Sequence, residues 1–365
     1  MMPPSLSTLQ KALKRKKLDA VLITQPENRR YLSGYTATDS SISESSGVLL
    51  IPAQGSPFLL TDSRFDIHAR EEANGFEVAL YPKGLHALLK NLLPRLGIKR
   101  LGFESHYVLH STADKMTRVL GKKNVELVPL TGLIEKMRIR KTSEEIEKIE
   151  KSVLLNEQVF QEVYRQLKPG MTEVEVALHI ETVMRLKGAE RPSFDTIVAA
   201  GPNSALPHAV PTSRPLQENE PIVIDMGLIL DGYCSDMTRT VVLGTPDNKT
   251  RTLFRLVRKA QKEGMAAIKA GVIARDVDRA ARQVIEKAGY GDRFGHGLGH
   301  GVGIAVHEPP SLGKRSRKKL KEGMVVTVEP GIYLPGWGGI RLENMVEVQT
   351  GGCRIFNRDT TFLDI

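Results

Sequence analysis

The sequence has little of three features that would place it in a special class of protein. Its two cysteines, Cys234 and Cys353, belong to no CxxC pair, which excludes a disulfide framework and a zinc-finger site. No apolar run approaches the roughly 18 residues that cross a bilayer, and no apolar stretch of signal-peptide length follows the basic residues near the N-terminus. With 41% hydrophobic and 26% charged residues, the chain is predicted to be a globular, cytoplasmic protein without a membrane partner.

The charge is unbalanced, with a formal net charge of +10 in 365 residues. Much of the excess lies in residues 314–321, KRSRKKLK, where six of eight residues are basic. Aromatic residues make up only 5% of the chain and none interrupts this run, whereas nucleic-acid-binding surfaces combine basic with aromatic side chains. We therefore expect a solvated loop, and nucleic acid is not an expected partner.

The first 130 residues alternate strand-like with helix-like stretches, which predicts an α/β domain. The expected strands are 20–24, 47–52, 58–62, 76–82, 100–103 and 125–130, and the expected helices are 7–17, 84–96 and 111–120. This part of the chain has no glycine-rich phosphate loop and no pair of carboxylates. The active site is therefore expected in the remainder of the chain.

A long helix is predicted to open the second domain. Thr142 is followed by Glu145 three residues later, which is the spacing of a capping box, and apolar residues recur at helical intervals after it. The boundary is placed within residues 132–142, giving an N-terminal domain of residues 1–135 and a catalytic domain of residues 136–365. A helix at 172–187, two helices within 249–287, and strands near 193–200, 221–244 and the C-terminal end predict an α+β fold for the second domain.

Two aspartates are predicted to converge on a hairpin. Residues 221–244 read PIVIDMGLILDGYCSDMTRTVVLG, and their turn is Asp231-Gly232, a dipeptide favoured in two-residue hairpin loops. Pairing outwards from this turn sets 230 against 233 and 227 against 236, so Asp225 and Asp236 become diagonal neighbours on one face. Such a pair shares a proton or binds a cation, and the alternative is two aspartates on an exposed face.

A second acidic pair occurs near the C-terminus. Glu329 ends the apolar stretch 324–328, and Glu343 is expected in the next strand, beyond a loop rich in proline and glycine. A glutamate at the end of such a strand is not expected to be buried without a partner or a metal ion. Arg341 shares a face with Glu343, so it is expected to orient that carboxylate or to form a simple ion pair with it.

A glycine-rich segment lies between the two acidic pairs. Residues 294–310 read FGHGLGHGVGIAVHEPP, with glycine at every second position from Gly295 to Gly303. So many glycines argue against a helix, which excludes a helical HExxH zinc site despite the spacing of His296 and His300. An extended segment with one bare face lets another backbone or a ligand approach closely. His300 is then a candidate metal ligand, and His307 a candidate proton-handling group.

Together these candidates form a ligand set for metal ions. Two Asp, one His and two Glu suit two divalent ions that share carboxylates. Mn²⁺ is the expected metal, and Co²⁺, Zn²⁺ and Fe²⁺ also fit the donor types. Two such ions activate a water molecule and polarise a carbonyl group, so hydrolysis of an amide is the predicted reaction. The five residues are Asp225, Asp236, His300, Glu329 and Glu343.

The motifs around these residues occur in a specific order over the C-terminal half. They are IDMG at Asp225, SDMTRT at Asp236, HGLGHGVG at His300, VHEPP at His307, VEPGIY at Glu329 and RLEN at Glu343. This set resembles the pita-bread metallopeptidases, in their aminopeptidase P and prolidase branch, whose N-terminal α/β domain is also matched here. The resemblance implies a pita-bread (creatinase/aminopeptidase-like) catalytic domain and a homodimer that acts on proline-containing peptides.

The resemblance also implies roles for individual residues. Asp225 would bind one ion, Asp236 and Glu343 would bridge both, and His300 and Glu329 would complete the shell of the second ion. His307 would stabilise or protonate the tetrahedral intermediate. His208, in LPHAVPT, would line the pocket near the proline side.

Departures from the family pattern concern the substrate. Asn344 follows Glu343 where an aspartate is frequent, but the ligand position itself is intact. In some prolidases an arginine just after the HExP segment grips the dipeptide carboxylate, and Ser311 stands there in this chain. This favours an Xaa-Pro aminopeptidase over an Xaa-Pro dipeptidase, unless Arg315 or Arg317 reaches that carboxylate. Two hypotheses without peptidase activity also stay open: a family member with different chemistry, such as the creatinase-like branch, and an inactive binding module.

Overall fold

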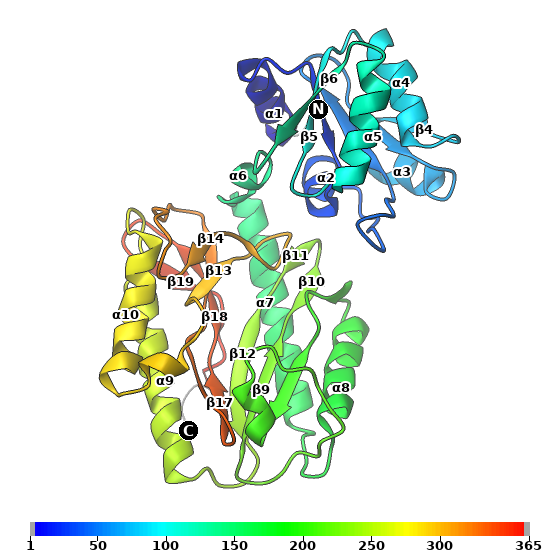
Figure 1. Ribbon diagram of the computed structural model, residues 1–365. Helices are drawn as coiled ribbons and strands as arrows, with labels where there is room; N and C mark the ends of the chain where they lie inside the picture. Colours follow the sequence, from blue (N-terminus) through cyan, green and yellow to red (C-terminus); the bar gives the residue numbers. More distant parts are fainter. Residues whose placement is uncertain (1–3, 361–365) are drawn as a thin grey trace. The chain divides into compact units, whose positions relative to one another are not determined.

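The computed structural model describes residues 4–360. The chain divides into two compact units between Met137 and Arg138, called here the N-terminal unit and the C-terminal unit. Each unit has its own helices and β-structure (Figure 1). Each also has its own hydrophobic cores. Among the described helices, none is both long enough and apolar enough to span a membrane.

The N-terminal unit is built on a mixed sheet of six strands in the order β4-β3-β2-β1-β5-β6. The strands are β1 (Ala20–Ile23), β2 (Val48–Pro52), β3 (Phe58–Thr61), β4 (Glu77–Leu80), β5 (Arg100–Glu104) and β6 (Glu126–Leu130). The helices are α1 (Pro4–Arg15), α2 (Pro26–Ser33), α3 (Asp66–Glu72), α4 (Leu85–Arg95), α5 (His110–Gly121) and the short α6 (Glu135–Arg138) at the boundary. This is the α/β architecture that the alternating pattern predicts.

Helices cover both faces of this sheet, because alternate strand residues point to opposite sides. Val21 and Ile51 pack in one core with α1, while Leu22 and Leu50 pack in the other core with α4 and α5. Helices α2 and α3 are not among the helices expected from the sequence. Both are short and mostly polar, so they give no apolar repeat at helical spacing.

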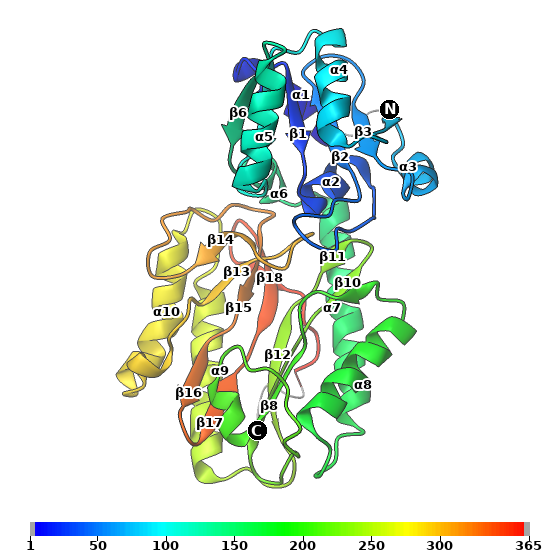
Figure 2. The same cartoon turned by 45° about the vertical axis from the view of Figure 1, so that its right-hand side comes forward.

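The described part of the C-terminal unit contains four sheets: β12-β9-β8, β14-β13-β15-β18-β19, and the smaller β11-β10-β7 and β16-β17. Two pairs of helices lie on opposite sides of the strands (Figure 2). Its helices are α7 (Ser143–Tyr164), α8 (Glu173–Leu186), α9 (Asn248–Ala266) and α10 (Ala274–Lys287), with 3-10 turns η1 (Gly201–Ala205) and η2 (Gly291–Arg293). Its first strands are β7 (Arg191–Pro192), β8 (Ile197–Ala200), β9 (Pro221–Met226), β10 (Leu228–Leu230), β11 (Tyr233–Cys234) and β12 (Met237–Val242). Its later strands are β13 (Gly299–Gly301), β14 (Glu308–Leu312), β15 (Val325–Val328), β16 (Gly331–Leu334), β17 (Gly338–Arg341), β18 (Asn344–Val348) and β19 (Cys353–Ile355).

The two helix pairs cover different sheets. Helices α7 and α8 pack on the sheet β12-β9-β8, and α9 and α10 pack on the sheet β14-β13-β15-β18-β19 and on the hairpin β16-β17. Capping boxes begin α7 at Thr142 and α8 at Thr172, in agreement with the predicted starts of these helices. Packing against helices on one side leaves the other face of each sheet available for polar side chains.

Because alternate side chains of a strand point to opposite faces, the acidic residues lie on the face that the helices do not cover. Ile224 and Met226 on β9 are buried against the helices, so Asp225 between them points the other way. The same alternation operates at the end of β17, where Ile340 and Leu342 belong to the core of α9 and α10. Arg341 and Glu343 therefore face away from that core. In β15, Val326 and Val328 face the same core, so Thr327 and the next residue after the strand, Glu329, face away from it.

The predicted hairpin register is confirmed. Asp231 and Gly232 form its turn with φ of 49° and 83°, the left-handed values that a type I′ turn requires. Leu230 pairs with Tyr233, and the same register continues into β9 and β12, where Asp225 pairs with Thr238. Asp236 therefore lies diagonally across from Asp225.

The glycine-rich segment is extended in part, with Gly299–Gly301 in strand β13 and bends on both sides of it, and two of its glycines allow close backbone contact. A Cβ atom on Gly299 would lie 2.1 Å from the Thr327 carbonyl oxygen, and one on Gly301 would lie 2.5 Å from that of Pro309. The expectation for Glu343 was wrong in one respect. Two further strands, β16 and β17, occupy the stretch after Glu329, and Glu343 lies in the short connection between β17 and β18.

Candidate active site

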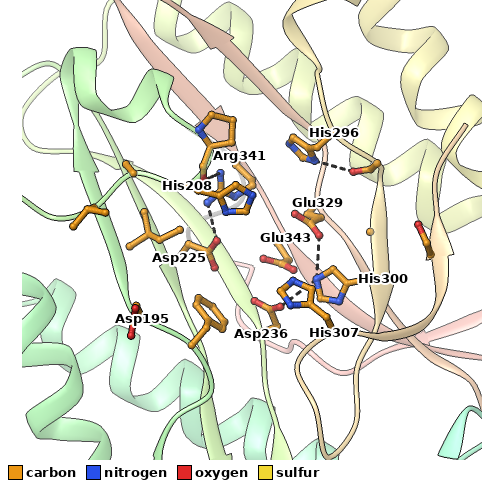
Figure 3. Close-up of a pocket in the computed structure, with 18 residues that line it drawn as sticks. Asp195, His208, Asp225, Asp236, His296, His300, His307, Glu329, Arg341 and Glu343 are labelled. Atoms are coloured by element: carbon orange, nitrogen blue, oxygen red, sulfur yellow. Dashed lines mark hydrogen bonds and ion pairs between the residues drawn. The ribbon is translucent and has the colours of Figure 1, made fainter. Parts of the chain in front are cut away.

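The candidate site is a cavity of about 510 Å³ in the C-terminal unit (Figure 3). All eight candidate residues from the sequence line it: Asp225, Asp236, His300, Glu329, Glu343, His307, His208 and Arg341. They come from strands β9, β13 and β17 and from the connections between strands, so residues more than 100 positions apart face one another. Sequence patterns place these side chains on separate strands, and the tertiary fold brings them to one cavity.

His300 lies at the centre of the acidic cluster. Its Nε2 atom is 3.5 Å from Asp236 Oδ2 and 3.4 Å from Glu329 Oε1. One ligand atom each from Asp236, His300 and Glu343 lies within 4.8 Å of the others. These distances are short enough for one cation to contact several of these side chains.

The ring of His300 is oriented to present a lone pair to this cluster. Its Nδ1 atom is 3.1 Å from the Gly301 carbonyl oxygen, and a proton on Nδ1 donates to that oxygen. In the neutral ring Nε2 then has no proton and faces Asp236 and Glu329. Burial, followed by the nearby His307, lowers the pKa of His300 to about 4, so the neutral ring is favoured at pH 7.

When no cation is present, the carboxyl groups of Asp236, Glu329 and Glu343 hold their protons more tightly than ordinary carboxyl groups do. Burial raises the pKa of Glu329 to about 8. Burial, reinforced by the negative charges of neighbouring acids, raises the pKa of Asp236 and of Glu343 well above the ordinary values. Several carboxyl groups that must share protons form a site that gains strongly when a divalent cation replaces those protons.

Protein donors satisfy only some of the carboxyl oxygens in the cluster. Among the described residues, Asp225 Oδ1 and Glu343 Oε1 are buried and have no hydrogen-bond partner. A buried carboxylate oxygen without a donor is costly, because it has lost its water without a replacement. The donor set of four carboxylates and one imidazole therefore fits divalent metal ions, with Asp225 and Glu343 each offering a free oxygen.

Arg341 has a different partner from the expected one. Its Nη2 atom donates to Asp225 Oδ2 at 2.7 Å, whereas Glu343 Oε2 accepts instead from the Thr238 hydroxyl at 2.8 Å. The expected pairing of Arg341 with Glu343 was wrong. Arg341 and Glu343 face the same side, but the guanidinium group of Arg341 extends to Asp225 on β9. Glu343 is bound instead by Thr238 on β12. Arg341 also donates to the hydroxyl of Tyr333 at 2.9 Å.

Sequence patterns did not predict the polar side chains that form hydrogen bonds with the cluster residues. Thr327 donates to Glu329 Oε1 at 3.1 Å, and Tyr333 links Arg341 to His296, whose Nε2 is 2.9 Å from the phenolic oxygen. Thr238 and Thr327 could be found from the alternation alone, because each is two positions from a candidate acid. Nothing in the sequence pairs Tyr333 with His296.

The cavity has a second side that is less polar and carries two further histidines. His307 and His208 lie at this side, and both are more exposed than the acidic cluster. The rings of His300 and His307 are 4.3 Å apart between centroids. Burial, followed by the neighbouring His208, lowers the pKa of His307. Apolar residues line the rest of this side: Phe194, Ile197, Pro207, Ala209 and Val210.

Two helix-backed sheets that hold a buried cluster of carboxylates around one histidine define the class of metal-dependent hydrolases. Comparisons with known proteins specify the class. Residues 147–350 match the model of metallopeptidase family M24, and residues 6–140 match the creatinase/prolidase N-terminal domain. The chain belongs to metallopeptidase family M24 and has its pita-bread fold, preceded by the creatinase-type N-terminal domain.

Relatives and solved structures cover nearly the whole chain. An Xaa-Pro dipeptidase of Pyrococcus furiosus is 35% identical over 97% of both chains. The structure of an Xaa-Pro dipeptidase from Bacillus anthracis matches with a TM-score of 0.90 and 35% identity over 97% of both chains. That of an X-Pro aminopeptidase from Thermotoga maritima has a TM-score of 0.85 and 37% identity over 95% of this chain and 98% of its own. The chain is therefore a hydrolase of the peptidase type.

Proposed function

We propose that this enzyme hydrolyses the peptide bond between an N-terminal residue and proline, with two divalent metal ions in the acidic cluster. One observation carries the proposal: four carboxyl groups and one imidazole converge in a cavity where protein donors satisfy only part of their oxygen atoms. When bound, two such ions supply an activated water and polarise the scissile carbonyl. The Xaa-Pro relatives of similar length support the choice of substrate.

The cluster residues hold the ions in this proposal. Asp225 would hold an ion through its Oδ1 atom, while Arg341 donates to Oδ2 and fixes the carboxylate. Asp236, Glu343, His300 and Glu329 would supply the other ligand atoms. The hydroxyl groups of Thr238 and Thr327 orient the two glutamates by hydrogen bonds. The motif order supports these roles, and so do the buried oxygens of Asp225 and Glu343 that have no partner among the described residues.

The two exposed histidines act on the substrate. His307, beside His300, donates a hydrogen bond or a proton to the carbonyl oxygen as negative charge develops on it. His208 lines the cavity near the apolar residues and contacts the proline side of the substrate. The apolar side excludes water around the proline ring, whereas the acidic cluster faces the scissile bond.

Two substrate lengths have support. The cavity favours an aminopeptidase that accepts longer peptides: its lining residues include Ser311, and their one arginine, Arg341, is already paired with Asp225. Arg315 and Arg317 are not among the lining residues. The Xaa-Pro dipeptidases among the relatives favour the dipeptidase.

Rates of hydrolysis of Xaa-Pro dipeptides and Xaa-Pro-Xaa tripeptides distinguish the dipeptidase from the aminopeptidase. We expect the Mn²⁺-loaded enzyme to release the first residue from Xaa-Pro-Xaa tripeptides with a kcat/KM at least equal to that on Xaa-Pro dipeptides. The reason is that the described cavity lining has no lysine and its one arginine, Arg341, is paired with Asp225, so no such side chain is left for a proline carboxylate. The control substrates have alanine in place of proline. Hydrolysis of dipeptides alone would establish the dipeptidase, and equal hydrolysis of the alanine peptides would contradict the proline specificity.

Three further properties belong to the same proposal. Mn²⁺ is the proposed metal, a homodimer the proposed assembly, and the cytoplasm the proposed compartment. Metal analysis of the protein as purified tests the first, because carboxylate and imidazole donors by themselves also accept Co²⁺, Zn²⁺ or Fe²⁺. Sedimentation tests the second, and the mass of the particle distinguishes one chain from two.

A further inference from the structure

A buried group of charges lies beside the candidate site and has no role in the proposed reaction. Glu308 accepts hydrogen bonds from Arg138 Nη2 and from Lys141 Nζ, the latter at 3.3 Å. The three side chains are 4%, 3% and 1% exposed. Burying three charges is costly, so the arrangement needs a reason beyond stability. We call these three residues the charge triad.

The carboxylate of Glu308 also holds the loop of residues 303–307. Its Oε1 atom accepts from the backbone N–H of Ala305 at 3.0 Å. A Cβ atom on Gly303 would lie 2.8 Å from both carboxylate oxygens, so the carboxylate packs directly on that glycine. Burial acts to raise the pKa of Glu308, but Lys141 and Arg138 outweigh it and lower the pKa below the ordinary value. The group therefore remains an acceptor for Ala305.

This loop carries His307, whose ring has little else to orient it. No hydrogen bond joins the His307 ring to another of the described residues, and its close ring contact is with His300. His300, in contrast, is oriented by the Gly301 carbonyl. The direction of the His307 ring therefore depends on the backbone of its loop, and Glu308 is the next residue along the chain.

We propose that the charge triad is a positioning device for His307: Arg138 and Lys141 hold Glu308, which fixes the loop and so places the imidazole over the candidate metal site. This inference rests on the proposed function and deepens it. Arg138 and Lys141 are thus positioning residues, because neither lines the cavity. A displacement of a catalytic group by about 1 Å can lower turnover by about 10²-fold, so the role is measurable.

A double-mutant cycle on the full-length enzyme tests the inference. Arg138→Met should lower kcat by about 10-fold to 10²-fold, leave KM within about twofold and keep both metal ions. In a His307→Ala background the same substitution should change kcat less than about twofold, because the group it positions is gone. Arg138→Lys, which keeps the charge, should recover most of the lost turnover.

Arg29→Met is a matched control, because Arg29 forms a buried ion pair with Asp39 at 3.0 Å in the N-terminal unit. It should lower the melting temperature without selectively lowering kcat. Equal losses from Arg138→Met with and without His307, or a loss of metal ions, would overturn the inference in favour of a purely structural role.

A second measurement does not depend on activity. Histidine-ring NMR signals of the metal-free protein should shift for His307 in Arg138→Met, while the signal of the exposed His110 in the N-terminal unit stays unchanged. An unshifted His307 signal would refute the positioning role. If the wild-type enzyme hydrolyses no Xaa-Pro peptide, the proposed function fails, and these spectra still decide whether the triad places His307.

Discussion

Buried acids in the two units have opposite surroundings. In the N-terminal unit, Glu104 is 4% exposed and accepts hydrogen bonds from the backbone of Thr24 at 2.6 Å, the backbone of Gln25 at 2.8 Å and the amide of Asn28 at 2.6 Å. In the C-terminal unit, Asp236 lies near Asp225 and Glu329, whose negative charges add to the effect of burial on its pKa. Burial raises the pKa in both places, but only Glu104 is enclosed by donors.

This difference separates a structural acid from a functional one. Donors around Glu104 satisfy its oxygens within the protein, so it joins β5 to the start of α2 and needs no ligand. In the acidic cluster, the buried oxygens Asp225 Oδ1 and Glu343 Oε1 have no hydrogen-bond partner within residues 4–360. Burial and a shifted pKa alone would not distinguish the two places, whereas the supply of hydrogen-bond donors does.

The largest expected effect comes from Asp236, a proposed ligand of the metal ions. Asp236→Asn should lower kcat/KM by more than about 10³-fold and reduce bound metal, because a neutral amide does not balance two cations. Glu104→Gln is the matched control: it should keep the metal and the activity and lower only the melting temperature. Full activity at normal metal content in Asp236→Asn would contradict the assignment of a dinuclear site.

A smaller loss is expected when His307 is removed, because this residue is proposed to act on the substrate rather than on the metal. His307→Ala should lower kcat by about 10²–10³-fold, as removal of one oxyanion-stabilising group does. Metal analysis of the same sample should show both ions still bound. Loss of an ion would instead make His307 a metal ligand.

The raised pKa of Glu329 should make the stability of the metal-free enzyme depend on pH. Glu329 has a pKa of about 8 in the folded chain against an ordinary value of 4.5, so the folded metal-free protein holds more protons than the unfolded chain. Its contribution to stability is therefore present below about pH 4.5 and is lost as the pH rises through about 8. The melting temperature of the metal-free enzyme should fall over this window.

Mn²⁺ should remove this pH dependence, because the ions replace the protons. Calorimetry in buffers of different ionisation enthalpy should detect protons released on binding. Glu329→Gln should reduce the release, and Glu104→Gln should not. Metal binding without proton release would show that the cluster is already ionised in the metal-free enzyme. This result would contradict the proposed difference between the acids of the cluster and Glu104.

The smallest effect is expected from the basic loop at 314–321. Replacing Arg315 and Arg317 with neutral residues should change KM less than about twofold, equally for Xaa-Pro dipeptides and for tripeptides, because neither residue lines the cavity. A rise in KM confined to dipeptides would show that the loop grips the terminal carboxylate. Salt-sensitive binding of random duplex DNA would instead make the loop a nucleic-acid surface.

Local signals predicted much of the fold. The threonines that cap α7 and α8 and the Asp231-Gly232 turn determine nearby backbone geometry, so these helices and this hairpin follow from short stretches of sequence. The hairpin β16-β17 was missed because its proline- and glycine-rich residues are typical of a loop. Its pairing depends on contacts with η1 and the core of α9 and α10, which no local pattern contains.

By itself, the sequence determined which side chains are available and on which face of its strand each one points. Alternation was sufficient for Asp225 within β9, because side-chain direction in a strand depends only on position parity, and it extends to Glu329 and Glu343, which follow the ends of β15 and β17. Only the tertiary structure decided which partners meet: Arg341 crosses to Asp225, and Glu308 meets Arg138, 170 residues earlier. Ion pairing and burial depend on distance in space, and separation along the chain does not determine that distance.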